Sequence, residues 1–575
     1  MAAPSRPGDT LGVELTGAFG LGLEVLGDLF FRKTVEVAGE KGEELCHTPS
    51  KVLGMPFDSS SAFVRALRDA GELVTIDAPV DPYLEISEIA DRVVKAGGPA
   101  LLFTSVRGSR FSVLINQFGT ERRAAMAFGA ASLRELEERV RTTIDLAVPG
   151  SLGGKLGKLA GLAQAGMSAM PRRVREAPSQ KVVMDPPDMT KLPVLTTWPL
   201  DGGPFITLPL VVTRDPESGR PNVGMYRVQV FDDRTVGMHW QRHKQGRAHA
   251  EKWGRRIPVA IAIGGDPALT YAATAPLPPV VDEFAFAGFL RGAPVRLTKA
   301  TTIDLDVPAD ADFIIEGWVD NDDLRVEGPF GDHTGVYSAA DLYPAMHVTA
   351  ITHRRDAIYA ATVVGKPPME GAWLGKTTER IFLPLLQMVV PEIVDYNLPV
   401  EGGFHNLAII AVRKSYPGQA KKVMAALWGL GHMMMLTRCL VVVDHDVDVS
   451  DVRGVAWTVL NNIDASRDLV IMPGPVDDLD HAGSYEIAVG HKLGIDATRK
   501  TAAEGYTRDW PPELRMDATT RARVTERWSE YGIGDLRRSG TRDEWSGQGP
   551  ERLARLLASL PMDPSDAAPR SERTK

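Results

Sequence analysis

The sequence predicts a mixed α/β protein in which a β-rich central region lies between two regions where helices and strands alternate. Three observations support this prediction. Helix and strand patterns alternate between residue 56 and about residue 103, short β runs separated by turns fill about 181–352, and strand–helix–strand order returns over about 356–498. A chain of 575 residues is also too long for one compact core, so several domains are expected.

The N-terminal region, 56–178, begins with an amphipathic helix at 62–68 that has a serine cap before it and Gly71 after it. A strand at 73–76, a second helix at 84–95 and a strand from residue 101 follow it. We expect residues 1–55 to be a dispensable extension. The Gly, Ala, Lys and Arg-rich segment 152–178 is expected to be a helical linker or a surface excursion.

The central region, 179–355, contains β runs at 208–212, 227–231 and 259–263, which are typical of a β-barrel or a β-sandwich. The run that starts at Arg227 alternates, so Arg227 and Gln229 point to one face of a strand and two valines to the other. The turn residues at 232–234 predict a hairpin, and residues of both its strands can then share one pocket.

The C-terminal region, 356–535, is expected to form a mostly parallel sheet, because strands and helices alternate along it. Its expected elements are a strand at 407–412, a helix at 418–430, a strand at 440–443, a helix at 450–462 and a helix at 516–531. The charged tail, 536–575, is expected to be disordered.

The composition excludes several classes of function. A net charge of -9 argues against nucleic-acid binding, which usually needs a basic stripe. Two cysteines, Cys46 and Cys439, exclude a disulfide scaffold and a cysteine-rich metal centre, and they suit a reducing cytosol. The apolar segment 11–31 carries three acidic residues, so it is not expected to span a membrane. We therefore expect a cytoplasmic protein.

The loop Glu327-Gly328-Pro329-Phe330-Gly331-Asp332 presents two carboxylates on a backbone that its glycines and proline shape. Neighbouring carboxylates push each other's pKa values apart, which suits acid–base chemistry. Alone, the loop could be an ordinary polar turn, and Arg227 could be a solvent-facing charge. Glu283 could likewise simply begin the helix of the apolar run 284–290, close to the positive end of that helix.

Taken together, several segments resemble the UbiD family of decarboxylases. They are Asn222–Arg227, Met238–Lys244, Glu283 and Glu327–Asp332, with further matches at 116–120, 391–395 and 494–498. The resemblance runs in order through about residues 56–535. It implies a split β-barrel domain that binds prenylated FMN, flanked by N-terminal and C-terminal α/β domains.

The resemblance also implies roles for individual residues. Asn222, His243 and Glu283 would hold a divalent cation, manganese or magnesium, for which mixed oxygen and nitrogen ligands are suitable; a monovalent cation is a further candidate. The flavin would contact Met225, Tyr226, Arg227, His239, Trp240, Gln241, Lys244 and Gln245, although relatives often have Arg at position 239 and Gly at position 245.

In the implied chemistry, Arg227 would hold the substrate carboxylate and Glu327 would be its charge partner. Asp332 would donate the proton that replaces carbon dioxide. A donor must be protonated at working pH, so we expect burial and the charge of Glu327 to raise the pKa of Asp332.

The implied reaction is non-oxidative decarboxylation of an aromatic, hydroxybenzoate-type acid, polyprenylated or not, in quinone biosynthesis or aromatic metabolism. Other phenolic, heteroaromatic and acrylic acids are alternatives. A flavin prenyltransferase would supply the cofactor, and the chain would form a dimer or hexamer, with peripheral membrane contact if the substrate is prenylated. Two other functions remain open: a metal-dependent hydrolase using Asn222, His243 and Glu283, and a non-catalytic flavin-binding subunit.

Overall fold

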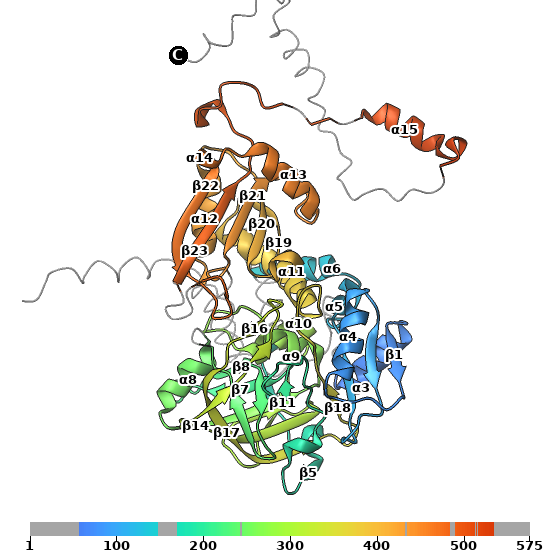
Figure 1. Ribbon diagram of the computed structural model, residues 1–575, viewed down its shortest axis with the longest axis vertical. Helices are drawn as coiled ribbons and strands as arrows, with labels where there is room; N and C mark the ends of the chain where they lie inside the picture. The colour runs from blue at the N-terminus through green and yellow to red at the C-terminus, as the bar shows by residue number, and fades with distance from the viewer. Residues whose placement is uncertain are drawn as a thin grey trace, which may run out of the picture.

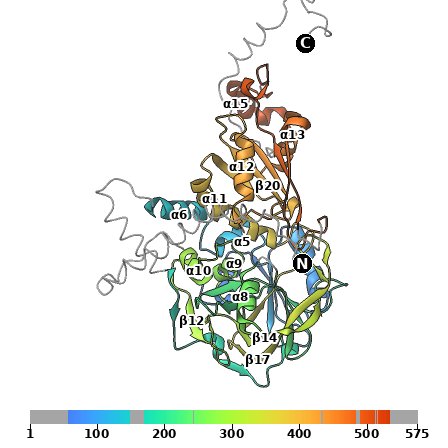
Figure 2. The same ribbon diagram turned by 90° about the vertical axis from the view of Figure 1, so that its left-hand side faces the viewer.

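The structure is a computed structural model that describes residues 57–147, 169–241, 244–431, 434–483, 489–511, 513–514 and 516–533. The predictions for residues 1–55, for residues 152–168 and for the tail 536–575 lie outside this part of the chain, and so does His243. The described fold is mixed α/β, as predicted. The C-terminal sheet stands above the central β region, and the N-terminal helices and strands lie beside that region (Figures 1 and 2).

The N-terminal region is a four-stranded sheet with strand order β1-β2-β3-β18. Its first helix begins as predicted, because the Ser59 hydroxyl accepts the N–H of Ala62 at 3.0 Å and Phe63 and Leu67 are buried. The elements are α3 Ser60–Asp69, β1 Leu73–Ile76, α4 Glu85–Lys95, β2 Ala100–Phe103, β3 Ser112–Ile115, α5 Glu121–Met126, α6 Leu133–Ala147 and β18 Ile358–Ala360. Because β18 pairs with β3, the chain returns to this sheet after the central region.

The central region is built on a nine-stranded sheet with strand order β6-β9-β10-β17-β14-β11-β7-β8, and β5 pairs with β17. Its strands are β5 Val182–Met184, β6 Phe205–Ile206, β7 Leu210–Arg214, β8 Pro221–Gly224, β9 Val228–Val230, β10 Thr235–Met238, β11 Arg256–Ile263, β14 Phe313–Glu327 and β17 Asp341–His353. The predicted hairpin is confirmed, since β9 and β10 pair antiparallel with Val236 opposite Val230. The sheet curls around a core of its own apolar side chains and those of the N-terminal region.

Three helices and two small sheets complete the central region. The helices are α8 Gln245–Trp253, α9 Pro267–Ala272 and α10 Glu283–Arg291, and the strands are β4 Arg172–Arg173, β12 Arg296–Lys299, β13 Asp306–Pro308, β15 Phe330–Gly331 and β16 Tyr337–Ser338. Strand β4 pairs with β12. The end of the segment expected to be a helical linker is therefore a strand of the central region.

The C-terminal region has a five-stranded sheet with strand order β19-β20-β21-β23-β22. Its elements are α11 Gly371–Val389, β19 Ile393–Asn397, β20 Leu407–Val412, α12 Gln419–Trp428, β21 Cys439–Asp444, α13 Val452–Asn462, α14 Ala465–Asp468, β22 Leu469–Pro475 and β23 Val489–Asp496, followed by α15 Ala518–Glu526. The expectation of a mostly parallel sheet is wrong. The inner pairs β20–β21 and β21–β23 are parallel, but both edge strands run antiparallel to their neighbours.

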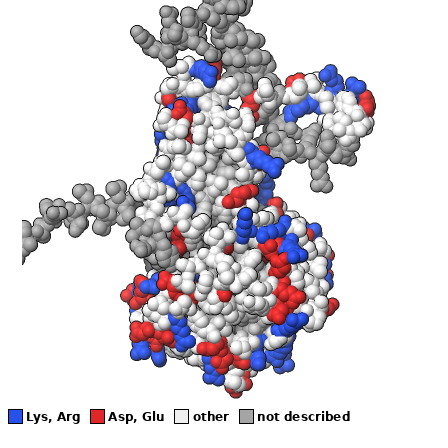
Figure 3. Space-filling model, in the orientation of Figure 1, with Lys and Arg blue, Asp and Glu red and all other residues white. Residues whose placement is uncertain are grey.

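The surface carries charges of both signs. On the face shown in Figure 3, Lys and Arg side chains are interspersed with Asp and Glu side chains around the lower part of the molecule, and the upper part is less charged. Within the described ranges, no helix combines the length and the apolar character that a membrane-spanning segment needs.

Candidate active site

The loop that follows β14 is fixed to the central sheet by side chains of two other segments. The Gln229 side chain, which belongs to β9 two residues after Arg227, accepts the N–H of Gly328 at 2.8 Å and donates to the Gly202 carbonyl at 2.8 Å. The Asp201 carboxylate accepts the N–H of Gly331 at 2.8 Å. These bonds hold both ends of the loop, so they set where its two carboxylates point.

Arg227 lies between those two carboxylates. Its Nε and Nη2 donate to the two oxygens of Glu327 at 2.7 and 2.9 Å, and its Nη1 donates to Asp332 Oδ2 at 2.8 Å. All three side chains are at most 10% exposed. The guanidinium carbon also lies 4.9 Å from the centre of the Phe330 ring. One buried guanidinium therefore compensates two buried carboxylates, Glu327 through two hydrogen bonds and Asp332 through one.

Histidines extend this group on both sides. His239, at the end of the hairpin, has Nδ1 3.1 Å from Glu327 Oε2 and its ring 4.3 Å from the ring of Tyr343. The backbone N–H and the Nδ1 of His333 both contact Asp332 Oδ1, at 2.7 and 2.8 Å. Each oxygen of the two carboxylates thus has a donor within hydrogen-bonding distance.

The electrostatics differ from the expectation for Asp332. Burial pushes the pKa of Asp332 upward, but the hydrogen bond from His333 and the charges of His333 and Arg227 outweigh it and hold the pKa well below its usual range. The same competition between burial and the hydrogen bonds from Arg227 and His239 lowers the pKa of Glu327 to about 2. The expected raised pKa of Asp332 is therefore wrong, because His333 and Arg227 together stabilise its charged form more than burial disfavours it.

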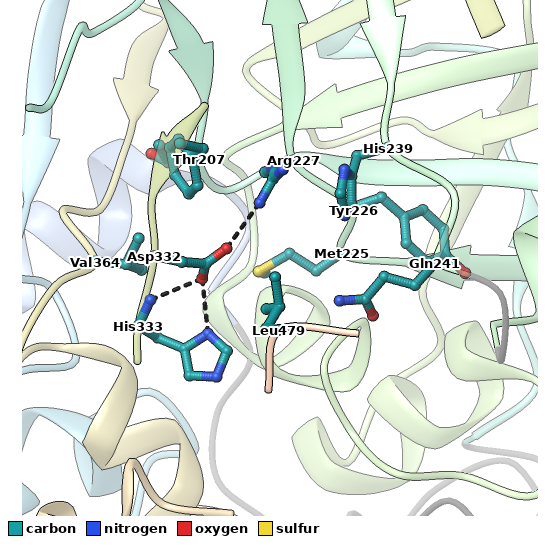
Figure 4. Close-up of a pocket in the computed structure, with 11 residues that line it drawn as sticks. Thr207, Met225, Tyr226, Arg227, His239, Gln241, Asp332, His333, Val364 and Leu479 are labelled. Carbon is teal, nitrogen blue, oxygen red and sulfur yellow. Dashed lines mark hydrogen bonds and ion pairs between the residues drawn. The ribbon is translucent and has the colours of Figure 1, made fainter. Parts of the chain in front are cut away.

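A cavity of about 200 Å³ opens beside this group (Figure 4). It is lined by Thr207, Met225, Tyr226, Arg227, His239, Gln241, Phe330, Asp332, His333, Val364 and Leu479. Figure 4 shows Arg227 and Asp332 joined across one side and Leu479 reaching the cavity from a segment of the C-terminal region. The cavity therefore combines an ionic wall with apolar side chains, as small-molecule sites commonly do.

Two of the three residues expected to bind a metal lie together behind the cavity. The N–H of Val223, next to Asn222, donates to Glu283 Oε2 at 3.0 Å, and both Asn222 and Glu283 are buried. The Asn222 amide lies 3.3 Å from the Thr213 hydroxyl and 3.4 Å from the Tyr226 hydroxyl. Burial raises the pKa of Glu283 to about 8.

No arginine or lysine in the described ranges forms an ion pair with Glu283, so this buried carboxylate has the character of a cation ligand. The same ranges contain no cluster of three His, Cys, Asp or Glu side chains suited to a metal. Asn222 is not one of those residue types, and His243 lies outside the described residues, so the expected ligand set stays a prediction.

The residues predicted to bind the flavin or the substrate fall into two groups, those that line the cavity and those that lie behind the lining residues. Met225, Tyr226, His239 and Gln241 line it directly, together with Arg227 and Asp332. Trp240 is buried against Tyr226, with ring centres 5.5 Å apart, and Glu327 is buried behind Arg227. Lys244 and Gln245 lie at the start of α8, where Gly246 N–H donates to the Tyr226 hydroxyl at 3.2 Å, and neither lines the cavity.

Several lining residues were not singled out from the sequence: Thr207, Val364 and Leu479. His333 directly follows Asp332 in the sequence, and a histidine beside a carboxylate is itself a signal for acid–base chemistry. No local pattern marks Leu479, because its place at the cavity depends on how the C-terminal region packs on the central one.

Two buried polar atoms fit a flavin. His239 Nε2 and Trp240 Nε1 have no hydrogen-bonding partner within the described part of the chain, although both are shielded from solvent. An unsatisfied buried polar atom costs about 1–3 kcal/mol. Both residues belong to the segment expected to contact the cofactor, so a polar ring system bound here would remove this cost.

Family models match three consecutive parts of the chain. The N-terminal domain of 3-octaprenyl-4-hydroxybenzoate carboxy-lyase matches residues 64–141, its Rift-related domain matches 172–367 and its C-terminal domain matches 372–497. An uncharacterised protein of Archaeoglobus fulgidus is 53% identical over 481 residues, which cover 83% of this chain and 99% of that protein. Another uncharacterised protein, from Aquifex aeolicus, is 46% identical over 84% of this chain and all of that protein.

Solved structures agree with these matches. The UbiD-class enzyme HmfF of Pelotomaculum thermopropionicum, solved in complex with FMN, is 29% identical with a TM-score of 0.65, and the match covers 79% of this chain and 97% of that one. The closed form of the vanillic acid decarboxylase of Sedimentibacter hydroxybenzoicus is 26% identical with a TM-score of 0.72, over 83% of this chain and 99% of that one. In sequence, in domain order and in fold, this chain belongs to the UbiD family of carboxy-lyases.

Proposed function

We propose that the protein is a non-oxidative decarboxylase that uses prenylated FMN to remove the carboxylate of an aromatic, hydroxybenzoate-type acid. One observation carries the proposal: a buried arginine at the cavity wall is held bidentately by Glu327 and singly by Asp332. Glu327 keeps the guanidinium in place through Nε and Nη2. The Nη1 bond to Asp332 can be exchanged for a substrate carboxylate, which has the same planar geometry.

This exchange explains how Asp332 can act as a proton donor although its pKa is low while it is paired with Arg227. When the substrate carboxylate takes the place of Asp332 on Arg227, Asp332 loses its cation and gains a negative neighbour. Both changes raise the pKa of a carboxyl group. Asp332 then accepts a proton, and after carbon dioxide leaves it can deliver that proton to the substrate carbon.

Prenylated FMN, when bound, supplies the electron sink for the pair that remains as carbon dioxide departs. Met225, Tyr226, His239, Trp240, Gln241, Lys244 and Gln245 would hold it beside Arg227, and the unpartnered nitrogens of His239 and Trp240 support this placement. Asn222, Glu283 and His243 would bind a divalent ion, manganese or magnesium, near its phosphate. The solved relatives in complex with FMN and with prFMN support the choice of cofactor.

The substrate class is proposed from the relatives and from the cavity. A vanillic acid decarboxylase shares the fold over nearly its whole length, and the cavity is lined by the apolar side chains of Phe330, Val364 and Leu479 as well as by Arg227. An aromatic ring between apolar side chains, with its carboxylate on Arg227, fits that arrangement. The identity of the acid that the protein decarboxylates will show whether it acts in quinone biosynthesis or in aromatic metabolism.

A substrate panel tests the proposal. The protein is produced together with a flavin prenyltransferase and assayed for carbon dioxide release from 4-hydroxybenzoate, its 3-prenylated derivative, vanillate, 3,4-dihydroxybenzoate, a heteroaromatic acid and cinnamate. We expect release from at least one hydroxybenzoate. Release only from the heteroaromatic acid or cinnamate would correct the substrate class. No release from any acid by flavin-loaded protein would contradict the function.

A further inference from the structure

The C-terminal region contributes a histidine to the active-site cluster. His405 lies just before β20, and its Nε2 is 2.6 Å from the Nε2 of His333, with the two ring centres 4.8 Å apart. The other ring nitrogen of His333 is 2.8 Å from Asp332 Oδ1. Three side chains from two regions of the fold therefore form one continuous line of hydrogen bonds, Asp332–His333–His405.

The backbone next to His405 is strained in a way that fixes this contact. Phe404 has a φ of 53°, in the left-handed region, which costs a non-glycine residue conformational energy. Its ring centre lies 5.3 Å from that of His333. Its Cβ also packs so closely on α11 that a Cβ at Gly375 would be 2.8 Å from it. The strained residue thus holds both the backbone of His405 and the ring of His333.

The reaction proposed above needs a proton path that the Arg227 cluster does not provide. Replacing a carboxylate by hydrogen consumes one proton per carbon dioxide released, and the donor Asp332 is only 7% exposed. Its Oδ2 faces Arg227, whose guanidinium does not release a proton in proteins, and its Oδ1 faces His333. His333 in turn meets His405, which is half-buried at the junction of the two regions.

We propose that His333 and His405 form the route by which a proton from solvent reaches Asp332 in each turnover. The inference rests on the proposed decarboxylase function and names the proton supply of that same site. It assigns to the C-terminal region a part in the chemistry, through His405, in addition to its apolar contact at Leu479.

The steps balance as four proton transfers. Asp332 loses its proton to the substrate carbon, where a C–H bond replaces the C–C bond to carbon dioxide. Nδ1–H of His333 then gives its proton to Asp332, Nε2 of His333 accepts the proton held by Nε2 of His405, and Nδ1 of His405 takes a proton from water. One proton enters from solvent per turnover, and a turn of each imidazole ring restores the starting tautomers.

The charges around the pair favour transfer of a proton from His405 to His333. Burial lowers the pKa of His333, but its hydrogen bond to Asp332 and the charges of Asp332 and Asp477 raise it, and Arg227 opposes them. Burial and the charge of His333 lower the pKa of His405 to about 4, with Asp477 and Asp332 opposing and Lys244 adding to the decrease. Of the two imidazoles, His333, which contacts Asp332, therefore holds a proton more tightly than His405.

The test uses the holoenzyme and the panel acid that wild type decarboxylates fastest. His405→Gln retains polar contacts but cannot pass a proton through a ring, and His405→Ala leaves space for added imidazole. The matched control is His491→Gln, at an exposed position on β23 of the same region. We expect kcat to fall about 100-fold in both His405 variants with KM and the flavin spectrum unchanged, and imidazole to restore part of it in His405→Ala. The control should keep its activity.

Activity of His405→Gln equal to wild type, or a loss in His405→Ala that imidazole does not relieve, would overturn the relay. If neither variant folds, the relay is tested on the wild-type enzyme by measuring how kcat depends on the deuterium content of the solvent. Several protons in transit predict a curved dependence, and a straight line would contradict the relay. A flavin-loaded wild type that releases carbon dioxide from no acid would instead overturn the proposed function, so the two failures are distinguishable.

Discussion

Arg227 donates three hydrogen bonds to two carboxylates that are themselves buried, so its removal leaves two uncompensated charges away from water. Breaking a buried ion pair by deleting one partner typically costs about 3–5 kcal/mol. We expect Arg227→Met to lower the free energy of unfolding by about that amount at neutral pH, measured by chemical denaturation. Adding Glu327→Gln should recover part of the loss, and equal stability of Arg227→Met and wild type would contradict the ionic account.

The stabilisation that Glu327 contributes to the fold depends on pH, and the direction of this dependence follows from its pKa. The pKa of Glu327 is about 2 in the folded protein, below its ordinary 4.5. A carboxyl whose pKa is lowered on folding stabilises the fold above its unfolded pKa, and this stabilisation disappears as the pH falls through the folded value. We therefore expect the difference in unfolding free energy between wild type and Glu327→Gln to be full above about pH 4.5 and to shrink toward pH 2. A difference that grows on acidification would contradict the ion pair.

Asp332 is the residue whose charge state matters most for turnover. We expect Asp332→Asn to lower kcat by about 100- to 10,000-fold, the usual contribution of a general acid, while flavin stays bound. Carbon dioxide release and the flavin absorbance of the purified variant measure the two effects. Asp233→Asn, in the exposed turn between β9 and β10, is the matched control and should behave as wild type. High activity in Asp332→Asn would remove Asp332 from the donor role.

The sequence indicated which residues carry the charges of the site. It did not indicate how these charges shift one another's pKa values. Glu327 and Asp332 are five positions apart, and that spacing suggested two carboxylates acting on each other. In the fold they both bind Arg227, which lies about 100 positions earlier in the chain, and His333 bonds Asp332 as well. A pKa depends on such long-range neighbours, so the direction for Asp332 could not be obtained from local spacing.

At the scale of elements, the loop after β14 depends on the backbone of Gly328. Its φ is 89°, and a Cβ there would lie 3.3 Å from the Cα of Ala340. We expect Gly328→Ala to cost about 1–3 kcal/mol of stability and to reduce kcat, because the loop carries both Glu327 and Asp332. Differential scanning calorimetry and the carbon dioxide assay measure these effects.

Gly219 offers a matched control for the backbone effect. It has a φ of 71° in the turn between β7 and β8, with open space where a Cβ would lie. Gly219→Ala should therefore cost similar stability without loss of kcat. If Gly328→Ala and Gly219→Ala affected kcat alike, the loop geometry would not be what positions the carboxylates.

Elements with strong periodicity were predictable, and their partners in the sheets were not. The alternation after Arg227 and the turn residues that follow it predicted the β9–β10 hairpin. The helix considered as an alternative for the apolar run after Asp282 is present, and the Asp282 side chain caps it at 2.7 Å. Nothing in the pattern of residues 358–360 shows that β18 completes the N-terminal sheet, or that β19 and β22 run antiparallel. Periodicity reports which face of an element is buried, not which strand lies beside it.

At the scale of the whole molecule, the metal site proposed at Glu283 predicts a link between bound metal and cofactor retention. It is the first residue of α10 and is buried beside Asn222. We expect Glu283→Gln to purify with less manganese or magnesium and less flavin than wild type, because a neutral amide binds a divalent cation less tightly. Elemental analysis and absorbance measure both. Glu121→Gln, at the exposed first position of α5, is the control. Unchanged metal and flavin in Glu283→Gln would contradict the site.

The cavity lies where residues of the central region meet Leu479 of the C-terminal region (Figure 4). Arg227, Glu327 and Asp332 come from the central region, and Leu479 and His405 reach the site from the C-terminal one. The sequence motifs lie mainly in the central region, which is why they predicted the ionic group and missed the residues that close the cavity.

Comparison of two preparations tests the central proposal most directly. The chain is produced once with and once without a flavin prenyltransferase, and both products are examined for bound flavin and for carbon dioxide release from the hydroxybenzoate panel. We predict that the first preparation binds prenylated FMN and decarboxylates at least one acid, and that the second does not decarboxylate. Protein without bound flavin in both preparations, or equal carbon dioxide release from both, would contradict a prenylated-FMN-dependent decarboxylase.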